Sequence, residues 1–167
     1  MDRDLSQFRP SKLWKRLPLE RRVEAAGLFW NDEHSTEQQV EAVSAIASHM
    51  KFRPRSVIAL DVNRRAKYLA QLPTLSDTIA ARALVNYHLD RQRPMMGAFL
   101  DMLGIPHENG LISEEQVQKP NAAKVRQAAH DLSSTFPSED VSLYLSTLVS
   151  QDPETWDALV DLPETKG

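Results

Sequence analysis

The residues best suited to metal chemistry are histidines that have a carboxylate beside them. His130 is followed directly by Asp131, and His88 and His107 lie upstream of this pair. Imidazole and carboxylate groups can together hold a divalent ion, which lowers the pKa of a bound water molecule. The other ligands would be His88 or His107, together with one of two downstream aspartates, Asp152 or Asp157. One hypothesis is therefore a metal centre built from these side chains.

A helical chain with the pair His130-Asp131 resembles the metal-dependent phosphohydrolases that are known for such a pair. The resemblance implies hydrolysis of a phosphate ester by metal-bound water. The chain departs from that pattern after the pair, because Leu132-Ser133-Ser134 lacks the glycine that these enzymes usually show nearby. The alternative interpretation is a surface histidine beside an aspartate, with His88 as a half-buried core residue and His107 in a solvated turn.

Other catalytic arrangements are missing from the sequence. Zero cysteines exclude disulfides and thiolate metal sites. No serine lies in the G-x-S-x-G context of a nucleophile elbow, and the five glycines form no phosphate-binding loop. We therefore expect no cofactor, and the sequence leaves open whether the protein binds a small molecule.

Arginine is the functional residue type that recurs in register. The offset is 44 residues for the first member of the set and 43 for the other two. The recurring residues are Arg9, Arg21 and Arg22, followed by Arg53, Arg64 and Arg65. Guanidinium groups are always charged and form rigid forks that suit carboxylate or phosphate. Stacked repeats would present them on one surface; the alternative is a solvated helix face whose side-chain stems cover apolar surface.

The charge is unevenly distributed although the net charge is only −3. Residues 1–83 carry 14 Lys/Arg against 10 Asp/Glu, and residues 84–167 carry 6 against 13. The segment from Pro137 onward holds seven acids and a single lysine, Lys166. The acidic segment could fold onto the basic half, the two could meet between chains, or the basic half could stay free for an acidic partner.

The arginines belong to a stretch that occurs twice, beginning at Phe8-Arg9-Pro10 and at Phe52-Arg53-Pro54. Prolines 10, 54, 94 and 137 are spaced 44, 40 and 43 residues apart, close to the roughly 40–47 residues of armadillo and HEAT repeats. We expect one all-α domain over residues 1–167, a short armadillo/HEAT-like superhelix without a sheet. Its expected units are 8–51, 52–92 and 93–136, with an end piece at 137–162.

Local signals predict where the helices begin and end. Pro10 and Pro54 suit a first helical residue, and Gly104 suits the position after a helix. N-cap residues are expected at three positions, Ser35 (in a capping box with Gln38), Asp61 and Asn121. Residues 105–112 are expected to form a loop with a turn at Glu108-Asn109-Gly110. A second capping box, Ser113 with Gln116, predicts a short helix before Pro120.

We expect a cytoplasmic helical scaffold or adaptor without catalytic activity, which binds an acidic protein through its repeat surface. The metal-dependent phosphohydrolase is the first alternative. Nucleic-acid binding by the basic N-terminal half is the second, although the pI of about 5.9 lies well below the values above 9 typical of such domains. A membrane partner is not expected, because no apolar run approaches 18 residues and the N-terminus lacks the apolar stretch of a signal peptide.

Overall fold

The computed structural model describes residues 4–112 and 118–166, and 71% of these described residues are helical. The expectation of an all-α protein is therefore confirmed. The elements are η1 (Ser6–Phe8), α1 (Pro10–Arg16), α2 (Leu19–Asn31), α3 (Thr36–Met50), α4 (Pro54–Ile58), α5 (Val62–Gln71), α6 (Asp77–Arg91), α7 (Arg93–Met102), β1 (His107–Glu108), β2 (Leu111–Ile112), α8 (Ala122–Thr135), α9 (Ser138–Gln151), η2 (Asp157–Leu159) and η3 (Pro163–Thr165). None of the described helices is both long and apolar enough to cross a membrane.

The expectation that the fold has no sheet is wrong at one place. Residues 105–112, expected to be a loop, contain the antiparallel strands β1 and β2, in which His107 pairs with Ile112 and Glu108 with Leu111. The connecting residues Asn109 and Gly110 have φ values of 50° and 91°. An Asn-Gly pair with positive φ at both positions matches the right-handed twist of paired strands, so the expected turn closes a hairpin. The short helix expected from Ser113 lies outside the described residues.

The structure divides into two compact units. The contiguous unit comprises residues 10–90, and the described part of the split unit comprises residues 4–9, 91–112 and 118–166. The single domain expected from the sequence stays a prediction. Each unit is described by itself below.

In the contiguous unit, two segments have the same order of helices. Residues 10–50, the first segment, form a short, a middle and a long helix (α1, α2, α3), and residues 54–91, the second segment, form the same series (α4, α5, α6). Pro10 and Pro54 are the first residues of α1 and α4, where the missing N–H has no helical partner to lose.

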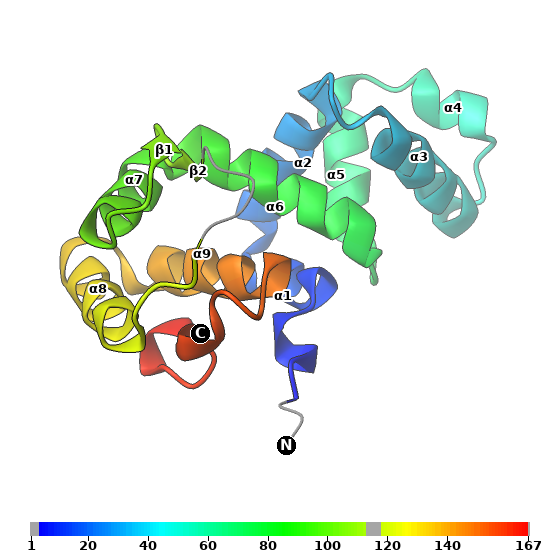
Figure 1. The fold of residues 1–167 in the computed structure, drawn as a ribbon. Coiled ribbons are helices and arrows are strands. Elements are labelled where there is room, and N and C mark those ends of the chain that lie inside the picture. Colours follow the sequence, from blue (N-terminus) through cyan, green and yellow to red (C-terminus); the bar gives the residue numbers. More distant parts are fainter. Residues whose placement is uncertain (1–3, 113–117, 167) are drawn as a thin grey trace. The chain divides into compact units, whose positions relative to one another are not determined.

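Helices α2 and α5 pack on each other at the centre of the contiguous unit (Figure 1). Helix α3 contacts α5 and α4. Helix α6 contacts α2 through the hydrogen bond from Arg21 to Tyr87, and contacts α1 through the bond from the Ser11 N–H to Asp77. Each long helix therefore meets the middle and the short helix of the other segment, so the two segments are interlocked.

The split unit is built around α9, whose residues from Val141 to Val149 are all buried. A helix that is buried on every side is a core helix rather than an amphipathic surface helix. Within its unit, α9 contacts η1, α8, η2 and η3. The ring of Phe99 on α7 lies edge-on to Tyr144 of α9, with centroids 5.9 Å apart, and 5.8 Å from the ring of Trp156.

The last described residues of the split unit are tied to α9 by buried hydroxyl groups. Ser146 Oγ donates to the carbonyl of Thr165 at 3.0 Å. Thr165 Oγ1 in turn donates to the carbonyls of Leu159 and Leu162, at 2.9 and 2.8 Å. Ser146 and Thr165 are both buried, so these bonds supply the partners that their polar groups need away from water.

Candidate functional site

The inner arginines, Arg22 and Arg65, lie within the packed pair of α2 and α5. Arg22 Nη1 donates to the carbonyl of Ala70 at 3.2 Å, near the end of α5. The guanidinium carbon of Arg65 lies 5.1 Å from the ring centroid of Trp30, near the end of α2. Each arginine comes from the first half of its own helix, so α2 and α5 run antiparallel. The Nε atoms of both are buried and make no hydrogen bond with the described residues.

The outer arginines, Arg21 and Arg64, precede the inner ones by one residue and have different surroundings. Arg21 Nη1 donates to the hydroxyl of the buried Tyr87 at 2.7 Å. Arg64 is exposed, and its backbone N–H donates at 2.8 Å to the carboxylate of Asp61, which caps α5 as expected. Because α2 and α5 are antiparallel, equivalent arginines lie toward opposite ends of the pair rather than in neighbouring tiers.

The remaining equivalent pair, Arg9 and Arg53, is divided between the two units. Arg9 is exposed after η1 in the split unit, and Arg53 is exposed before α4 in the contiguous unit. Of the six arginines predicted from the sequence, three are exposed in the contiguous unit. Arg21 is one of them but donates to Tyr87, whereas Arg53 and Arg64 are close to the same short helix in the chain. They belong to a larger group of cations.

Residues 42–76 carry six Lys/Arg and one acid, Asp61, whose carboxylate caps α5. Five of these cations are exposed, and we call them the basic corner: Lys51, Arg53, Arg55, Arg64 and Lys67. None of the five has an ion pair or a side-chain hydrogen bond within residues 4–112 and 118–166. The basic corner is thus a cluster of charge that the described part of the fold does not neutralise.

A ring contact links the two parts of the basic corner. Phe52, between Lys51 and Arg53, lies edge-on to Tyr68 of α5 with centroids 5.9 Å apart. Arg64 precedes Tyr68 by four residues, so helical geometry places both on the same face of α5. The segment from Lys51 to Arg55 therefore borders the exposed face of α5. Phe52 is 38% and Ile58 62% exposed, so apolar side chains accompany the cations.

Lys51 has an unusual backbone conformation. Its φ and ψ are 56° and 38°, in the left-handed region, where it ends α3 while the Phe52 N–H donates to the Ala47 carbonyl at 2.9 Å. Glycine is the usual residue at such a position because a Cβ atom is disfavoured there. The chain therefore carries a lysine at a position where the backbone alone favours glycine.

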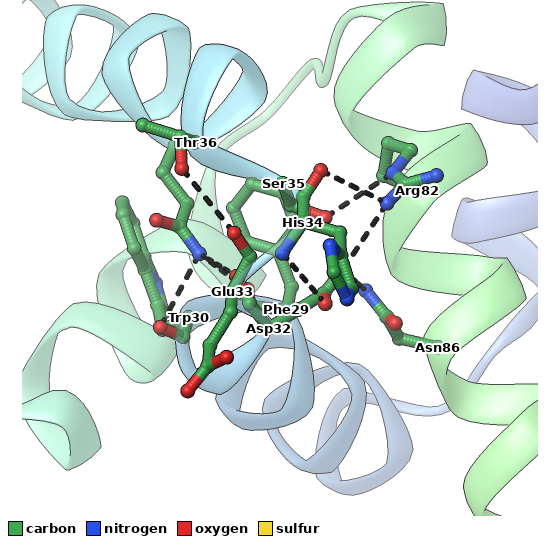
Figure 2. Close-up of polar contacts among 10 residues, drawn as sticks. Phe29, Trp30, Asp32, Glu33, His34, Ser35, Thr36, Arg82 and Asn86 are labelled. Carbon is green, nitrogen blue, oxygen red and sulfur yellow. Dashed lines mark hydrogen bonds and ion pairs between the residues drawn. The ribbon is translucent and has the colours of Figure 1, made fainter.

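A polar joint of buried and half-buried groups connects α2, α3 and α6 (Figure 2). Asp32 accepts hydrogen bonds from Ser35 Oγ, from Arg82 Nη2 at 3.2 Å and from Asn86 Nδ2 at 3.1 Å. Ser35 Oγ also accepts from Arg82 Nε at 3.1 Å. Gln39 Nε2 donates to the carbonyls that end α2, including those of Phe29 at 2.9 Å and Asp32 at 2.8 Å.

The electrostatics of the joint keep Asp32 ionised. Burial acts to raise the pKa of Asp32, but the hydrogen bonds from Ser35, the His34 N–H and Asn86, together with the charge of Arg82, outweigh it and lower the pKa. The Ser35 hydroxyl is fully buried and donates to Asp32, so it has no access to a substrate. The joint is therefore suited to holding three helices together rather than to nucleophilic catalysis.

The histidines of the metal hypothesis have separate surroundings. His88 is buried in α6 of the contiguous unit, where burial lowers its pKa to about 4. His130 is exposed on α8, with its Nδ1 3.6 Å from Glu164, and Asp131 accepts a hydrogen bond from Gln127 at 2.8 Å. Across the described ranges, no three His, Cys, Asp or Glu side chains are grouped so that they could hold a metal ion.

His107 fixes the hairpin to α7. Its Nδ1 accepts from the Gly110 N–H at 2.9 Å, and its Nε2 lies 2.7 Å from Asp101 of α7. Arg93 adds a hydrogen bond to the Asn109 carbonyl at 2.9 Å. A Cβ atom on Gly110 would lie 2.9 Å from Met96 Cβ, so only glycine fits this contact. Both ring nitrogens of His107 are thus engaged in holding the hairpin.

Sequence reasoning missed the polar joint, although part of its signal was present. A capping box between Ser35 and Gln38 was predicted, whereas the neighbouring Gln39 binds the end of α2 and the Ser35 hydroxyl binds Asp32. The partners Arg82 and Asn86 are about 50 residues away in the chain, and no local pattern identifies them.

No protein-family model, curated protein or solved structure matches the chain. The function is therefore argued from the side chains themselves.

Proposed function

We propose that this protein is a helical adaptor without catalytic activity, and that its contiguous unit binds an acidic surface of another protein. The observation that carries the proposal is the basic corner, where five exposed cations have no acidic partner among the described residues. Complementary charge raises the rate of encounter between proteins and selects among partners. An acidic protein surface would supply the charge that the fold leaves unpaired.

A protein partner fits this surface better than nucleic acid does. Single-stranded nucleic acid is bound by aromatic side chains on which bases stack. In the basic corner, the aromatic ring of Phe52 is already in contact with Tyr68. The more exposed apolar side chain is Ile58, which is aliphatic and offers no ring for stacking. Aliphatic and aromatic groups beside arginine are common at the centres of protein interfaces. The phosphohydrolase alternative has no comparable support from the arrangement of His107, His130 and Asp131.

We further infer that the first and second segments are two copies of one three-helix unit. The repeated Phe-Arg-Pro start, the equal order of helices and the equivalent inner arginines support this relation. The antiparallel pairing of α2 with α5 implies an approximate two-fold rotation between the copies. Such a pair would be closed, unlike an armadillo-like superhelix, in which successive units stack in one direction.

The proposal is tested by comparing the proteins that co-purify with two charge variants after mild cross-linking. Arg53→Glu combined with Arg64→Glu reverses two charges of the basic corner, and Lys12→Glu combined with Lys15→Glu makes the same change on exposed residues of α1. We expect proteins that are recovered by the wild type and the α1 variant, identified by mass spectrometry, to be lost with the corner variant and at high salt. Identical recovery by all three proteins would contradict the proposal.

A further inference from the structure

We propose that the basic corner is a docking site for a short, acidic segment of a partner protein that carries aliphatic side chains between its carboxylates. This inference rests on the proposed function and specifies the chemistry of the partner. It requires three properties of the corner: cations on two elements, an apolar contact between them and a local backbone that presents them. Each is provided by described residues.

The cations come from α5 and from the segment that leads into α4, and one ring contact joins this segment to α5. Arg53 and Arg55 lie at the start of α4, and Arg64 and Lys67 lie on the exposed side of α5. The contact between Phe52, just before α4, and Tyr68 places the segment that leads into α4 beside α5. An extended or helical acidic segment could therefore contact the cations near α4 and the cations of α5 at the same time. Cations on one helix face alone would offer only one of these two sets of contacts.

The apolar contact is provided by Phe52 and Ile58. Both are exposed, although the residue beside Ile58, Val57, is fully buried and anchors α4 to the core. An exposed aliphatic group on an anchored helix loses little conformational freedom when a ligand covers it, so its burial contributes to affinity. Carboxylates alone would leave these two side chains in water, and for that reason the inferred ligand includes aliphatic residues.

The backbone at Lys51 gives an independent indication. A lysine with φ of 56° is disfavoured relative to glycine, but its side chain adds a cation beside Phe52 and Arg53. An unfavourable conformation that persists at a charged, exposed position is the kind of observation from which a functional role is inferred. The role inferred here is contact with the acidic segment.

The inference is tested with a fluorescent peptide of about 11 residues, three helical turns, composed of Asp, Glu and Leu. Anisotropy measures its binding to the intact wild-type chain and to the two double variants. We expect Arg53→Glu with Arg64→Glu to weaken binding at least tenfold, equivalent to about 1.4 kcal/mol, and Lys12→Glu with Lys15→Glu to change it less than about twofold. Equal losses of peptide affinity in the corner variant and the α1 variant would show that binding depends only on the net charge of the protein. That result would overturn the proposal.

Lys51→Gly separates binding from folding. Removing the side chain from the left-handed position should raise Tm by about 2–4 °C. Loss of the cation should weaken the binding of the peptide by about threefold. Stability and affinity would then move in opposite directions, which damage to the fold cannot produce. A Lys51→Gly protein that binds the peptide as the wild type does would exclude Lys51 from the site and contradict the inference.

The chemistry of the ligand is tested with three further probes. A peptide with every Leu replaced by Ser should bind about tenfold more weakly, and an oligo-dT of equal charge and phosphatidylserine vesicles should bind more weakly than the Leu peptide. Tighter binding of oligo-dT or of vesicles would show that nucleic acid or a membrane surface is the ligand instead of an acidic peptide. A wild-type dimer that the corner variant abolishes would show that the ligand is a second copy of the chain. If no peptide binds but partners are still lost with the corner variant, the inference fails while the proposed function stands.

Discussion

The first and second segments of the contiguous unit use equivalent arginines in two ways. The inner arginines, Arg22 and Arg65, have parallel roles, since each reaches the far end of the other middle helix. The outer arginines differ, because Arg21 is bound to the buried Tyr87 whereas Arg64 is exposed without a side-chain partner in the described structure. The difference teaches that a residue repeated in register can be structural in both copies. Where the equivalent residue has a structural contact in one copy only, as Arg21 has, the residue without that contact, Arg64, is the better candidate for binding.

The largest effect is expected from a difference between the two long helices. His88 is the twelfth residue of α6, and the twelfth residue of α3 is Ala47. Burial lowers the pKa of His88 to about 4, so as the pH falls from about 6.5 to 4 the unfolded chain binds a proton that the folded chain does not. Stability should then fall by about 3 kcal/mol through this group alone.

His88→Gln should remove that dependence, whereas His49→Gln, at an exposed position of α3, should leave it. The measurement is the free energy of unfolding by urea at several pH values between 4 and 7. Only the difference between wild type and variant is interpreted, because carboxylates titrate in all three proteins. Parallel pH profiles for the wild type and His88→Gln would contradict the prediction.

The next effect concerns the polar joint, which the second segment lacks at the end of α5. Asp32→Ala removes the acceptor for Ser35, Arg82 and Asn86, and we expect a loss of about 2–3 kcal/mol in unfolding free energy. Asp61→Ala, the acid that caps α5, should cost only about 1 kcal/mol. Thermal and urea unfolding measure both, and equal losses would show that the joint has no role beyond capping.

A smaller effect separates the inner from the outer arginine of α5. Arg65→Glu places a carboxylate against the face of Trp30 and should destabilise the fold by about 2 kcal/mol. Arg64→Glu should change stability by less than about 0.5 kcal/mol, because the side chain is exposed. Circular dichroism during urea unfolding compares the two. A more destabilising change at Arg64 would reverse the assignment of roles.

The smallest expected effect comes from one position at which the first and second segments differ. Gly27 of α2 corresponds to Ala70 of α5 at the offset of 43, and a Cβ atom on Gly27 would meet nothing within 4 Å. Gly27→Ala should therefore stabilise the protein by about 0.5–1 kcal/mol, as expected for a glycine within a helix. Gly110→Ala, which would bring Cβ within 2.9 Å of Met96 Cβ, is the opposite control and should destabilise.

Local features of the fold could be predicted from the sequence because they depend on neighbouring residues. Asp61 and Asn121 cap α5 and α8 with their side chains. Gly104 has a φ of 68°, and the Ile105 N–H donates to the Leu100 carbonyl as in a Schellman motif. Each of these predictions needed only a residue type and its place relative to an apolar stripe.

Features that depend on distant residues could not be predicted. The relative direction of α2 and α5 decides whether Arg22 and Arg65 face water or pack on the opposite helix. The sequence of neither helix alone determines that direction. The hairpin strands have two residues each, too few to show an alternating pattern. For the candidate site, the sequence indicated Arg53 and Arg64 within a larger set, and only the structure separated them from the inner arginines.

The division of the chain has a consequence for the order in which it folds. The split unit needs η1, near the start of the chain, and α9, more than 120 residues later, because the two are in contact. During synthesis, the contiguous unit can acquire all of its own helices first, while η1 waits for its partner. Domains generally fold as units as they emerge, and contacts between distant residues form slowly. We therefore expect a ribosome-bound chain, made long enough for Asp90 to have left the exit tunnel, to protect the contiguous unit from protease while η1 remains cleavable.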